Sequence, residues 1–366
     1  MPGRINTERL RELFRDMVNI YSPTGKEGQI TEYLARYLYE NDLPVTMREV
    51  TEGRRNIEVV FGPGSPELAF IGHIDTVPAF DIENYEYQEE NGEVFGLGTA
   101  DMKGGCAAMI EAFVSHIENG GKIENTALFL VVGEEDNGDG TAAMLEAMSF
   151  PWAIVAEPTN LVPCFDHFGY IEMLVQAYGR RRHASMAGRD QNAVFSLLRT
   201  LLRLAETIET EFPETVMNIR SVHSSESGFA VPGSSEAWLD MHIKPEQDSR
   251  EFVSTLKKLA DECLCGGAVT SHEITFPTIA GGYSLEQSGR LWEILKKAYS
   301  NQGIGWKPGT FKSHSDANLL RDAGCKPVIL GPGRLARAHT RDEAVSFDEV
   351  AASAGLYRQM LSIMQP

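Results

Sequence analysis

The chain has 366 residues, a length at which two domains are the default expectation, because single hydrophobic cores stop growing at about 250–300 residues. Hydrophobic residues make up 42% and charged residues 23% of the sequence, proportions that are ordinary for a globular protein and exclude a disordered chain. The formal net charge of −19 argues against nucleic acid or an anionic membrane surface as a partner, because phosphate binding needs clustered lysine and arginine.

The first half of the chain alternates helical patterns with short apolar runs. Two amphipathic helices are predicted at the start, where apolar residues recur at helical spacing from Leu10 to Met17 and from Ile30 to Leu38. A further helical pattern covers 105–117. The apolar runs have the length of strands and lie at 57–61, 68–71, 128–132 and 152–155. This alternation predicts a layered α/β domain with a mostly parallel sheet.

The pattern changes near residue 168. Strands that alternate apolar and polar residues and helices now follow one another in β-α-β-α order, with a short closing strand. These elements are expected at about 170–178, 191–206, 236–243, 249–263 and 273–276. The order favours a small inserted α+β domain of the ferredoxin-like, split βαβ kind.

The α/β pattern resumes after Gly282, with an apolar strand at 327–330 and a last helix at 348–363. We therefore expect a large α/β domain that comprises 1–167 and 280–366, with the smaller domain inserted at 168–279.

The cysteines favour a reducing compartment. They are odd in number and irregularly spaced: Cys106, Cys164, Cys263, Cys265 and Cys325. Cys263 and Cys265 are separated by one residue, which is neither a CxxC redox pair nor a zinc knuckle. No signal-peptide core and no membrane-length apolar run is found in the sequence. We therefore expect reduced thiols in a cytoplasmic protein without membrane attachment.

Metal-ligating residue types gather where the predicted strands end, as a hydrolytic metal site requires. The run at 68–71 leads into His73 and Asp75, which point the same way on an extended chain, so that Asp75 can orient the His73 ring. Asp101 precedes the helix at 105–117. Taken singly, a strand-end histidine and a helix-capping aspartate need no ligand to explain them.

Two adjacent carboxylates, Glu134 and Glu135, follow the run at 128–132. The two carboxylates repel each other at the end of a buried strand, and a bound cation or a shared proton relieves this repulsion. An alternative is a calcium loop of the EF-hand kind at 135–146. Its first position is Glu rather than Asp, and a strand rather than a helix precedes it, so we favour the strand-end interpretation.

Two more candidates lie farther along the chain. Glu157 follows the run at 152–155, and His339 comes after the strand predicted at 327–330. Each residue alone has an ordinary structural explanation. Together, however, ligand-type residues follow four or five strands of one parallel sheet, at the edge where ligand sites form in α/β domains. The joint pattern therefore indicates a metal site.

In this order the motifs resemble those of the zinc metallopeptidase family that includes acetylornithine deacetylase, succinyl-diaminopimelate desuccinylase, aminoacylase and bacterial glutamate carboxypeptidase. The resemblance covers essentially the whole chain. It rests on GHIDTVP at 72–78, GTADMKGG at 98–105, GEE at 133–135, AEPT at 156–159, GRRRHAS at 179–185 and AH at 338–339.

The resemblance implies two zinc ions per subunit, with Co²⁺ or Mn²⁺ as possible substitutes. His73 and Glu157 are expected to hold one ion, and Glu135 and His339 the other. Asp101 is expected to bridge the two. Imidazole nitrogen and carboxylate oxygen are ligands that zinc accepts, and a metal-bound water is acidified towards neutral pH.

The resemblance also assigns catalytic roles. Glu134 is expected to be the general base, Asp75 to support His73, and a cis peptide to follow Asp101. The inserted domain matches a lid or dimerisation domain. In it, His183 is expected to reach the active site of a partner subunit and bind the tetrahedral oxyanion, which implies a homodimer.

Two positions depart from the family's pattern for gripping substrate. Ala230 stands where many relatives carry Asn, and His242 where they carry Arg. A neutral histidine cannot replace the bidentate contact of arginine with a carboxylate. The candidate substrate contacts are Asn218, Arg220, Ser315 and Gly333.

We expect a metal-dependent amide hydrolase that removes an N-acyl group from an amino acid, of the acetylornithine or succinyl-diaminopimelate kind. An alternative is a di-zinc carboxypeptidase or dipeptidase on the same scaffold. A third possibility is a catalytically silent binding protein, against which the intact Glu134 argues. In each case the expected partner is a small molecule, with neither nucleic acid nor a membrane involved.

Overall fold

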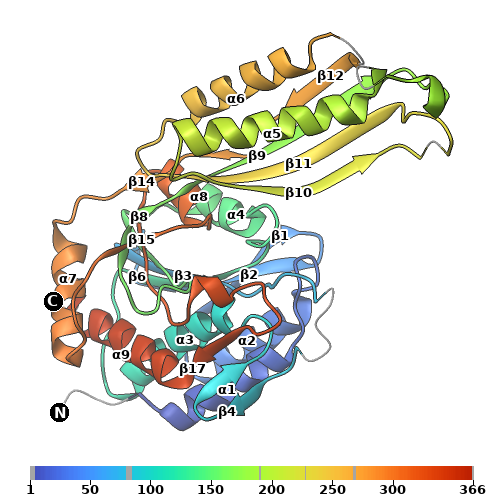
Figure 1. The fold of residues 1–366 in the computed structure, drawn as a ribbon. Helices are drawn as coiled ribbons and strands as arrows, with labels where there is room; N and C mark the ends of the chain where they lie inside the picture. Colours follow the sequence, from blue (N-terminus) through green and yellow to red (C-terminus); the bar gives the residue numbers. More distant parts are fainter. Residues whose placement is uncertain (1–4, 80–84, 189–190, 227, 267–268, 365–366) are drawn as a thin grey trace. The chain divides into compact units, whose positions relative to one another are not determined.

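The computed structural model describes residues 5–79, 85–188, 191–226, 228–266 and 269–364, which form two compact units. The first unit comprises Met1–Phe165, Leu285–Phe311 and Ser315–Pro366. The second unit comprises Asp166–Ser284 and Lys312–His314. The colours of Figure 1 trace the second unit as a middle stretch of the chain inserted into the first.

The first unit is built around a mixed sheet whose central strands are parallel. The strand order is β1-β2-β6-β3-β7-β16-β8, with β15 beside β8. Strands β6, β3, β7 and β16 run parallel, whereas β1, β2 and β8 run antiparallel to their neighbours. The bounds are β1 Val45–Thr51, β2 Arg54–Phe61, β3 Leu68–His73, β6 Thr126–Val131, β7 Trp152–Val155, β8 Cys164–His167, β15 Gly309–Phe311 and β16 Lys326–Ile329. The predicted α/β class with a mostly parallel sheet is confirmed.

Helix α3 (Gly104–Glu118) lies in the core of this unit, in contact with β3, β6, α1 and α9. Its glycine pair permits a close approach: a Cβ at Gly105 would strike the carbonyl oxygen of Ala156, just after β7. The start of α3, which follows Asp101, therefore lies against the end of the strand that precedes Glu157. The other helices of the unit are α1 Thr7–Asn19, α2 Gly28–Glu40, α4 Asp139–Ala147, α7 Arg290–Gln302, α8 Ala317–Asp322 and α9 Phe347–Met364.

A small three-stranded sheet completes the first unit, in the order β17-β5-β4. It joins β4 (Gln88–Glu90) and β5 (Glu93–Phe95) to β17 (Ala344–Ser346), which comes from the far end of the chain. None of the helices among the described residues is long and apolar enough to cross a lipid bilayer.

The second unit has the βαββαβ order of a ferredoxin-like domain. Its antiparallel sheet has the order β10-β11-β9-β12, with the short β13 beside β9. Apolar side chains of the strands and of α5 and α6 form one core cluster. The elements are β9 Gly169–Gly179, α5 Ala193–Glu211, β10 Val216–Ser224, β11 Ser234–Ile243, α6 Ser249–Leu264, β12 Val269–Thr275, β13 Ile279–Ala280 and β14 Tyr283–Ser284, the last pairing with the end of β8.

Strand β10 is the longest element of this domain that the sequence pattern did not predict; the two-residue strands β13 and β14 were not predicted either. It lies at the edge of the sheet, and most of its residues are exposed. Because burial on one face is what produces the alternating signal, an exposed edge strand leaves only a weak trace in the sequence. The β-α-β-α order expected from the sequence is therefore corrected by one strand.

Candidate metal centre

The candidate ligands come from separate segments of the first unit that meet at the carboxyl edge of its sheet. His73 is the last residue of β3, and Glu157 is the second residue after β7. Glu134 and Glu135 follow β6, and Asp101 lies in the irregular segment Thr99–Lys103 before α3. Parallel neighbours bring their carboxyl ends to the same edge, which explains the convergence.

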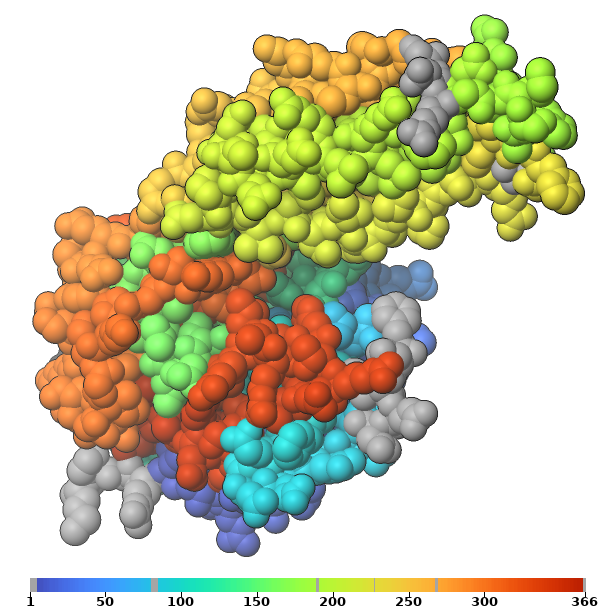
Figure 2. Space-filling view, viewed as in Figure 1, coloured from blue at the N-terminus to red at the C-terminus, as the bar shows by residue number. Residues whose placement is uncertain are grey.

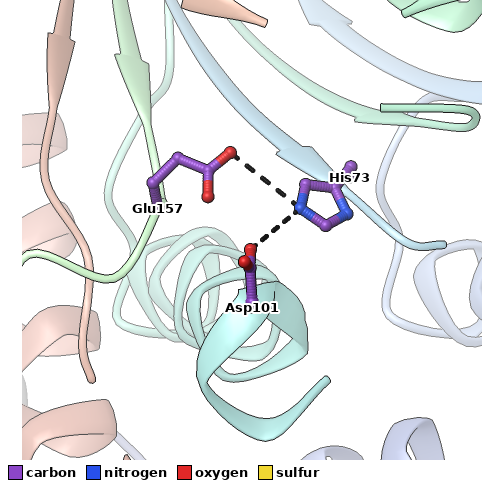
Figure 3. Close-up of side chains that lie close together, drawn as sticks. All are labelled: His73, Asp101 and Glu157. Atoms are coloured by element: carbon purple, nitrogen blue, oxygen red, sulfur yellow. Dashed lines mark hydrogen bonds and ion pairs between the residues drawn. The ribbon is translucent and has the colours of Figure 1, made fainter. Parts of the chain in front are cut away.

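One group of possible ligands consists of His73, Asp101 and Glu157, all buried (Figure 3). The His73 Nε2 atom lies 3.2 Å from Asp101 Oδ1 and 3.9 Å from Glu157 Oε1. One ligand atom from each residue lies within 4.8 Å of the others, close enough to share an ion. Glu157 Oε1 is buried without a hydrogen-bond partner, as expected of an oxygen that binds a cation instead.

A second group consists of Asp101, Glu135 and His339. The His339 Nε2 atom lies 3.3 Å from Asp101 Oδ2 and 3.0 Å from Glu135 Oε2. Burial disfavours the charged imidazolium, but hydrogen bonds to Asp101 and Glu135 raise the pKa of His339 to about 11. Asp101 belongs to both groups and turns a different oxygen to each, as a bridging carboxylate does.

The charges of the cluster favour a bound cation. Burial raises the pKa of Glu134 well above its ordinary value, and the nearby carboxylates of Asp316 and Glu135 add to the shift. Burial and the carboxylate of Asp101 raise the pKa of Glu157 in the same way. Buried carboxylates that repel one another beside imidazole nitrogens are a donor set that divalent metals such as zinc accept. The residues present fit a pair of such ions.

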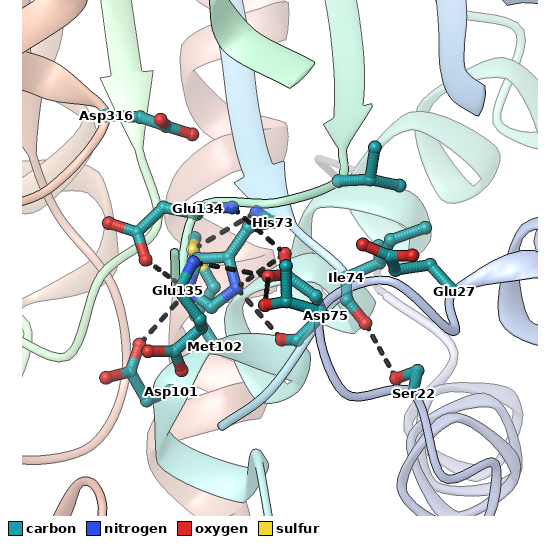
Figure 4. A network of polar contacts seen from close by, with 12 residues as sticks. Ser22, Glu27, His73, Ile74, Asp75, Asp101, Met102, Glu134, Glu135 and Asp316 are labelled. Carbon is teal, nitrogen blue, oxygen red and sulfur yellow. Dashed lines mark hydrogen bonds and ion pairs between the residues drawn. The ribbon is translucent and has the colours of Figure 1, made fainter. Parts of the chain in front are cut away.

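Asp75 holds the loop that carries the two glutamates (Figure 4). Its carboxylate accepts the backbone N–H of Glu134 at 3.3 Å and of Glu135 at 3.2 Å, and the hydroxyl of Thr24 donates to it at 2.6 Å. The His73 Nδ1 atom contacts the main-chain oxygen of Asp75 at 3.0 Å, whereas the carboxylate is 3.6 Å away. Asp75 therefore touches His73 mainly through its backbone, a detail that the sequence did not reveal.

Glu134 lies beside the first group, with its Oε2 atom 3.8 Å from His73 Nε2. Asp316 faces it in Figure 4 and is itself buried, where the hydroxyl of Thr141 donates to it at 2.8 Å. Burial raises the pKa of Asp316 to about 6. The sequence pattern assigns no role to Asp316.

The candidate substrate contacts are divided between the two units. In the second unit, Asn218 and Arg220 lie on β10, where their side chains contact Asp240 at 3.3 Å and Glu172 at 2.9 Å. In the first unit, Ser315 is buried. Gly333 has a φ of +86° and donates its N–H to Glu349 at 2.9 Å.

His183 lies in the second unit and is exposed; its Nδ1 atom is 2.8 Å from Ser185 Oγ. The cis peptide expected after Asp101 is present at Asp101–Met102. The calcium alternative does not fit the structure, because α4 begins at Asp139, inside the supposed loop, and strand β6 precedes it.

The parallel sheet and the imidazole and carboxylate groups at its carboxyl edge define the class of α/β metallohydrolases. The chain belongs to the peptidase family M20/M25/M40, whose model matches residues 69–362. This confirms the family predicted from the motifs, and it makes the chain a metal-dependent hydrolase of amide bonds.

Known relatives span nearly the whole chain. It is 26% identical to an acetylornithine deacetylase from Edwardsiella ictaluri, over 95% of this chain and 96% of the relative. It is 28% identical to a putative [LysW]-lysine/[LysW]-ornithine hydrolase from Pyrobaculum aerophilum, over 94% of each chain. A tripeptidase structure from Staphylococcus aureus matches the fold with a TM-score of 0.81 at 22% identity, over 99% of each chain.

Proposed function

We propose that the chain is a two-zinc deacylase that removes an N-acyl group from an amino acid with a second amino group, of the ornithine or lysine kind. The observation that carries the proposal is the shared position of Asp101. One of its oxygens faces His73 and the other faces His339, with Glu134 beside the pair. Two ligand groups joined by one carboxylate, with a further buried carboxylate free to move a proton, suit the hydrolysis of an amide bond.

In this proposal His73, Asp101 and Glu157 hold one ion, and Asp101, Glu135 and His339 hold the other. The donor set of nitrogen and oxygen suits Zn²⁺, and Co²⁺ or Mn²⁺ can occupy the same ligands. When bound, such ions acidify a water molecule and polarise the amide carbonyl.

The remaining steps belong to the chain's own residues. Glu134, whose Oε2 atom lies 3.8 Å from His73 Nε2, is placed to take a proton from the attacking water and pass it to the leaving amine. Asp75 fixes Glu134 through the backbone N–H that it accepts. We further propose that His183 of the partner subunit binds the oxyanion, and that Asn218, Arg220, Ser315 and Gly333 contribute to substrate contact.

The choice of a diamino acid rests on the relatives and on charge. Both full-length relatives above are named for ornithine or lysine derivatives. A net charge of −19 favours the approach of a cationic side chain. With Ala230 and His242 in place of the family's Asn and Arg, the grip on the substrate carboxylate must come from other groups.

The homodimer also belongs to the proposal and is supported by the surface of the second unit. Helix α5 exposes Phe195, Leu198 and Leu202, which are spaced three and four residues apart on one side of the helix. The outer side of α5 lies at the surface in Figure 2. The edge strand β10 adds unpaired backbone groups, which a second copy can pair. No disulfide joins any of the five cysteines, all of which lie among the described residues, and this agrees with the proposed cytoplasmic location.

The decisive experiment combines metal removal with replacement of the base. Chelation should abolish amidase activity, and two equivalents of Zn²⁺ or Co²⁺ per subunit should restore it. The Glu134→Gln variant should bind the same amount of metal and lose about 10²–10⁴-fold in kcat, the usual contribution of a general base. Full activity after chelation, or an E134Q variant as active as the unchanged protein, contradicts the mechanism.

A substrate panel separates the alternatives. N-acetylornithine and N-succinyl-diaminopimelate should be cleaved with higher kcat/KM than N-acetylleucine, because only the former carry a second amino group. Cleavage of unmodified dipeptides without cleavage of the acyl amino acids would establish the peptidase instead. Failure on every amide, with both metals bound, would favour the binding protein.

A further inference from the structure

Glu343 is a buried acid that neither the sequence motifs nor the proposed chemistry uses. The residue exposes only 3% of its surface. Its Oε1 atom accepts the backbone N–H of Ala100 at 2.9 Å and of Asp101 at 3.1 Å, and its Oε2 atom accepts that of Gly98 at 3.0 Å. One carboxylate therefore accepts three backbone N–H groups, those of Gly98, Ala100 and Asp101, from the loop that carries Asp101.

The small sheet of the first unit sets this contact. Strand β17 follows Glu343 directly and pairs antiparallel with β5, with Ala344 opposite Phe95. The N–H of Gly96 then donates to the main-chain oxygen of Glu343 at 3.3 Å. This register lays Glu343 alongside the loop that leaves β5, so that its side chain meets the amides of 98–101.

The loop needs such a partner because its backbone is irregular. Gly98 has a φ of +79°, and Asp101 lies outside helical values at φ −122° and ψ 93°. Ala100 and Asp101 are buried, so their N–H groups require an acceptor within the protein. On another side of the loop, the buried Lys103 ammonium donates to the carbonyls of Met17 and Ile20.

We propose that Glu343 is a positioning residue for the bridging carboxylate, and that it joins the segments of Asp101 and His339, two of the three segments that supply the group Asp101, Glu135 and His339. Glu343 lies four residues after His339 in the sequence and bonds the amide of Asp101 directly. Through it, the position of the C-terminal ligand segment and the orientation of Asp101 depend on each other. This inference rests on the proposed two-metal site.

The test is a metal titration of Glu343→Gln against Asp342→Asn. The amide of E343Q keeps one acceptor oxygen and turns an NH₂ group towards at least one backbone N–H, whereas D342N removes the same charge from an exposed neighbour. Loss of an outer-shell partner typically weakens metal affinity about 10–100-fold. We expect that loss in E343Q at one of the two sites, seen as a changed Co²⁺ absorption spectrum, with D342N unchanged.

Three further measurements keep the outcomes distinct. Glu343→Asp keeps the negative charge on a side chain that is shorter by one methylene, so its metal affinity should lie between those of the unchanged protein and E343Q. It replaces E343Q in the test if E343Q does not fold. Unfolding of the metal-free proteins measures a purely structural role. A loss of stability without loss of metal affinity would overturn the inference. Asp101→Asn should lose metal in every case; if it does not, the proposed two-metal function fails instead.

Discussion

Gly133 occupies a position where a single methyl group should damage the site. It directly precedes Glu134 and has a φ of +81°, a left-handed conformation that residues with a Cβ rarely adopt. A Cβ at this position would strike the Asp139 carboxylate and lie 2.6 Å from Arg54 Nη2. These two groups form an ion pair, and Arg54 is held in turn by the buried Glu27 at 2.7 Å. The neighbours of Gly133 therefore have little freedom to move.

The expected magnitude for Gly133→Ala follows from two effects. The left-handed conformation costs an alanine about 1–2 kcal/mol. Displacing a packed ion pair is an overpacking change, which costs about 1–3 kcal/mol. The free energy of unfolding should therefore fall by about 2–5 kcal/mol. A shift of about 1 Å in Glu134 and Glu135 should also lower kcat/KM by about 10²-fold, because catalytic groups tolerate little misplacement.

Gly92→Ala provides a matched control. Gly92 has a φ of +83°, but a Cβ there meets no atom within 4 Å. It should therefore show the conformational cost alone, about 1–2 kcal/mol in a urea titration, with unchanged kcat/KM. Steady-state kinetics and metal content complete the comparison. If G133A loses no more stability than G92A and keeps its activity, the crowding argument is wrong.

Two further predictions concern the second unit. Burial lowers the pKa of His167 to about 3, below its value of about 6.5 in the unfolded chain. The unfolded chain therefore binds the proton first, so stability is complete above pH 6.5 and falls as the pH drops towards 3. His167→Phe should reduce that fall by about 2 kcal/mol between pH 6.5 and 5, measured by denaturant unfolding, and an unchanged slope would contradict the assignment. On α5, Leu202→Glu and Leu202→Lys should each convert the proposed dimer to monomers, as measured by sedimentation equilibrium. If the protein without any substitution is monomeric and active, the proposed dimer is excluded.

Much of the candidate site could be predicted from the sequence because its residues sit at the ends of parallel strands. The apolar runs before His73, Glu134 and Glu157 mark buried strands, and parallel strands bring their carboxyl ends to one edge. The sequence pattern therefore indicates both which residues can bind a metal and that they lie at the same edge of the sheet. The inserted domain was equally visible through the alternation in β9 and β11, whose inward side chains are buried.

The parts that the sequence hid depend on contacts between distant segments. Glu343 meets the loop at 98–101 only because β17 pairs with β5, two strands of three residues each that carry no detectable period. Asp316 lies near Glu134 in the structure although about 180 residues separate them in the sequence. Nothing in its local sequence distinguishes it from a helix-capping aspartate. The role of Asp75 is visible only in the backbone amides that it accepts.

Three of the segments that carry the candidate ligands contain a residue with a left-handed φ near the ligand, and in one of them that residue is not glycine. Gly98 and Gly133 adopt left-handed φ values of +79° and +81°, and glycine does so without strain. His339 adopts φ +58°, where a side chain costs about 1–2 kcal/mol. Glycine would remove that strain but also the imidazole that contacts Asp101 and Glu135. Strain held at a side chain that faces two carboxylates supports the ligand role proposed for His339, because a residue that served only as a spacer in this loop would be more stable as glycine.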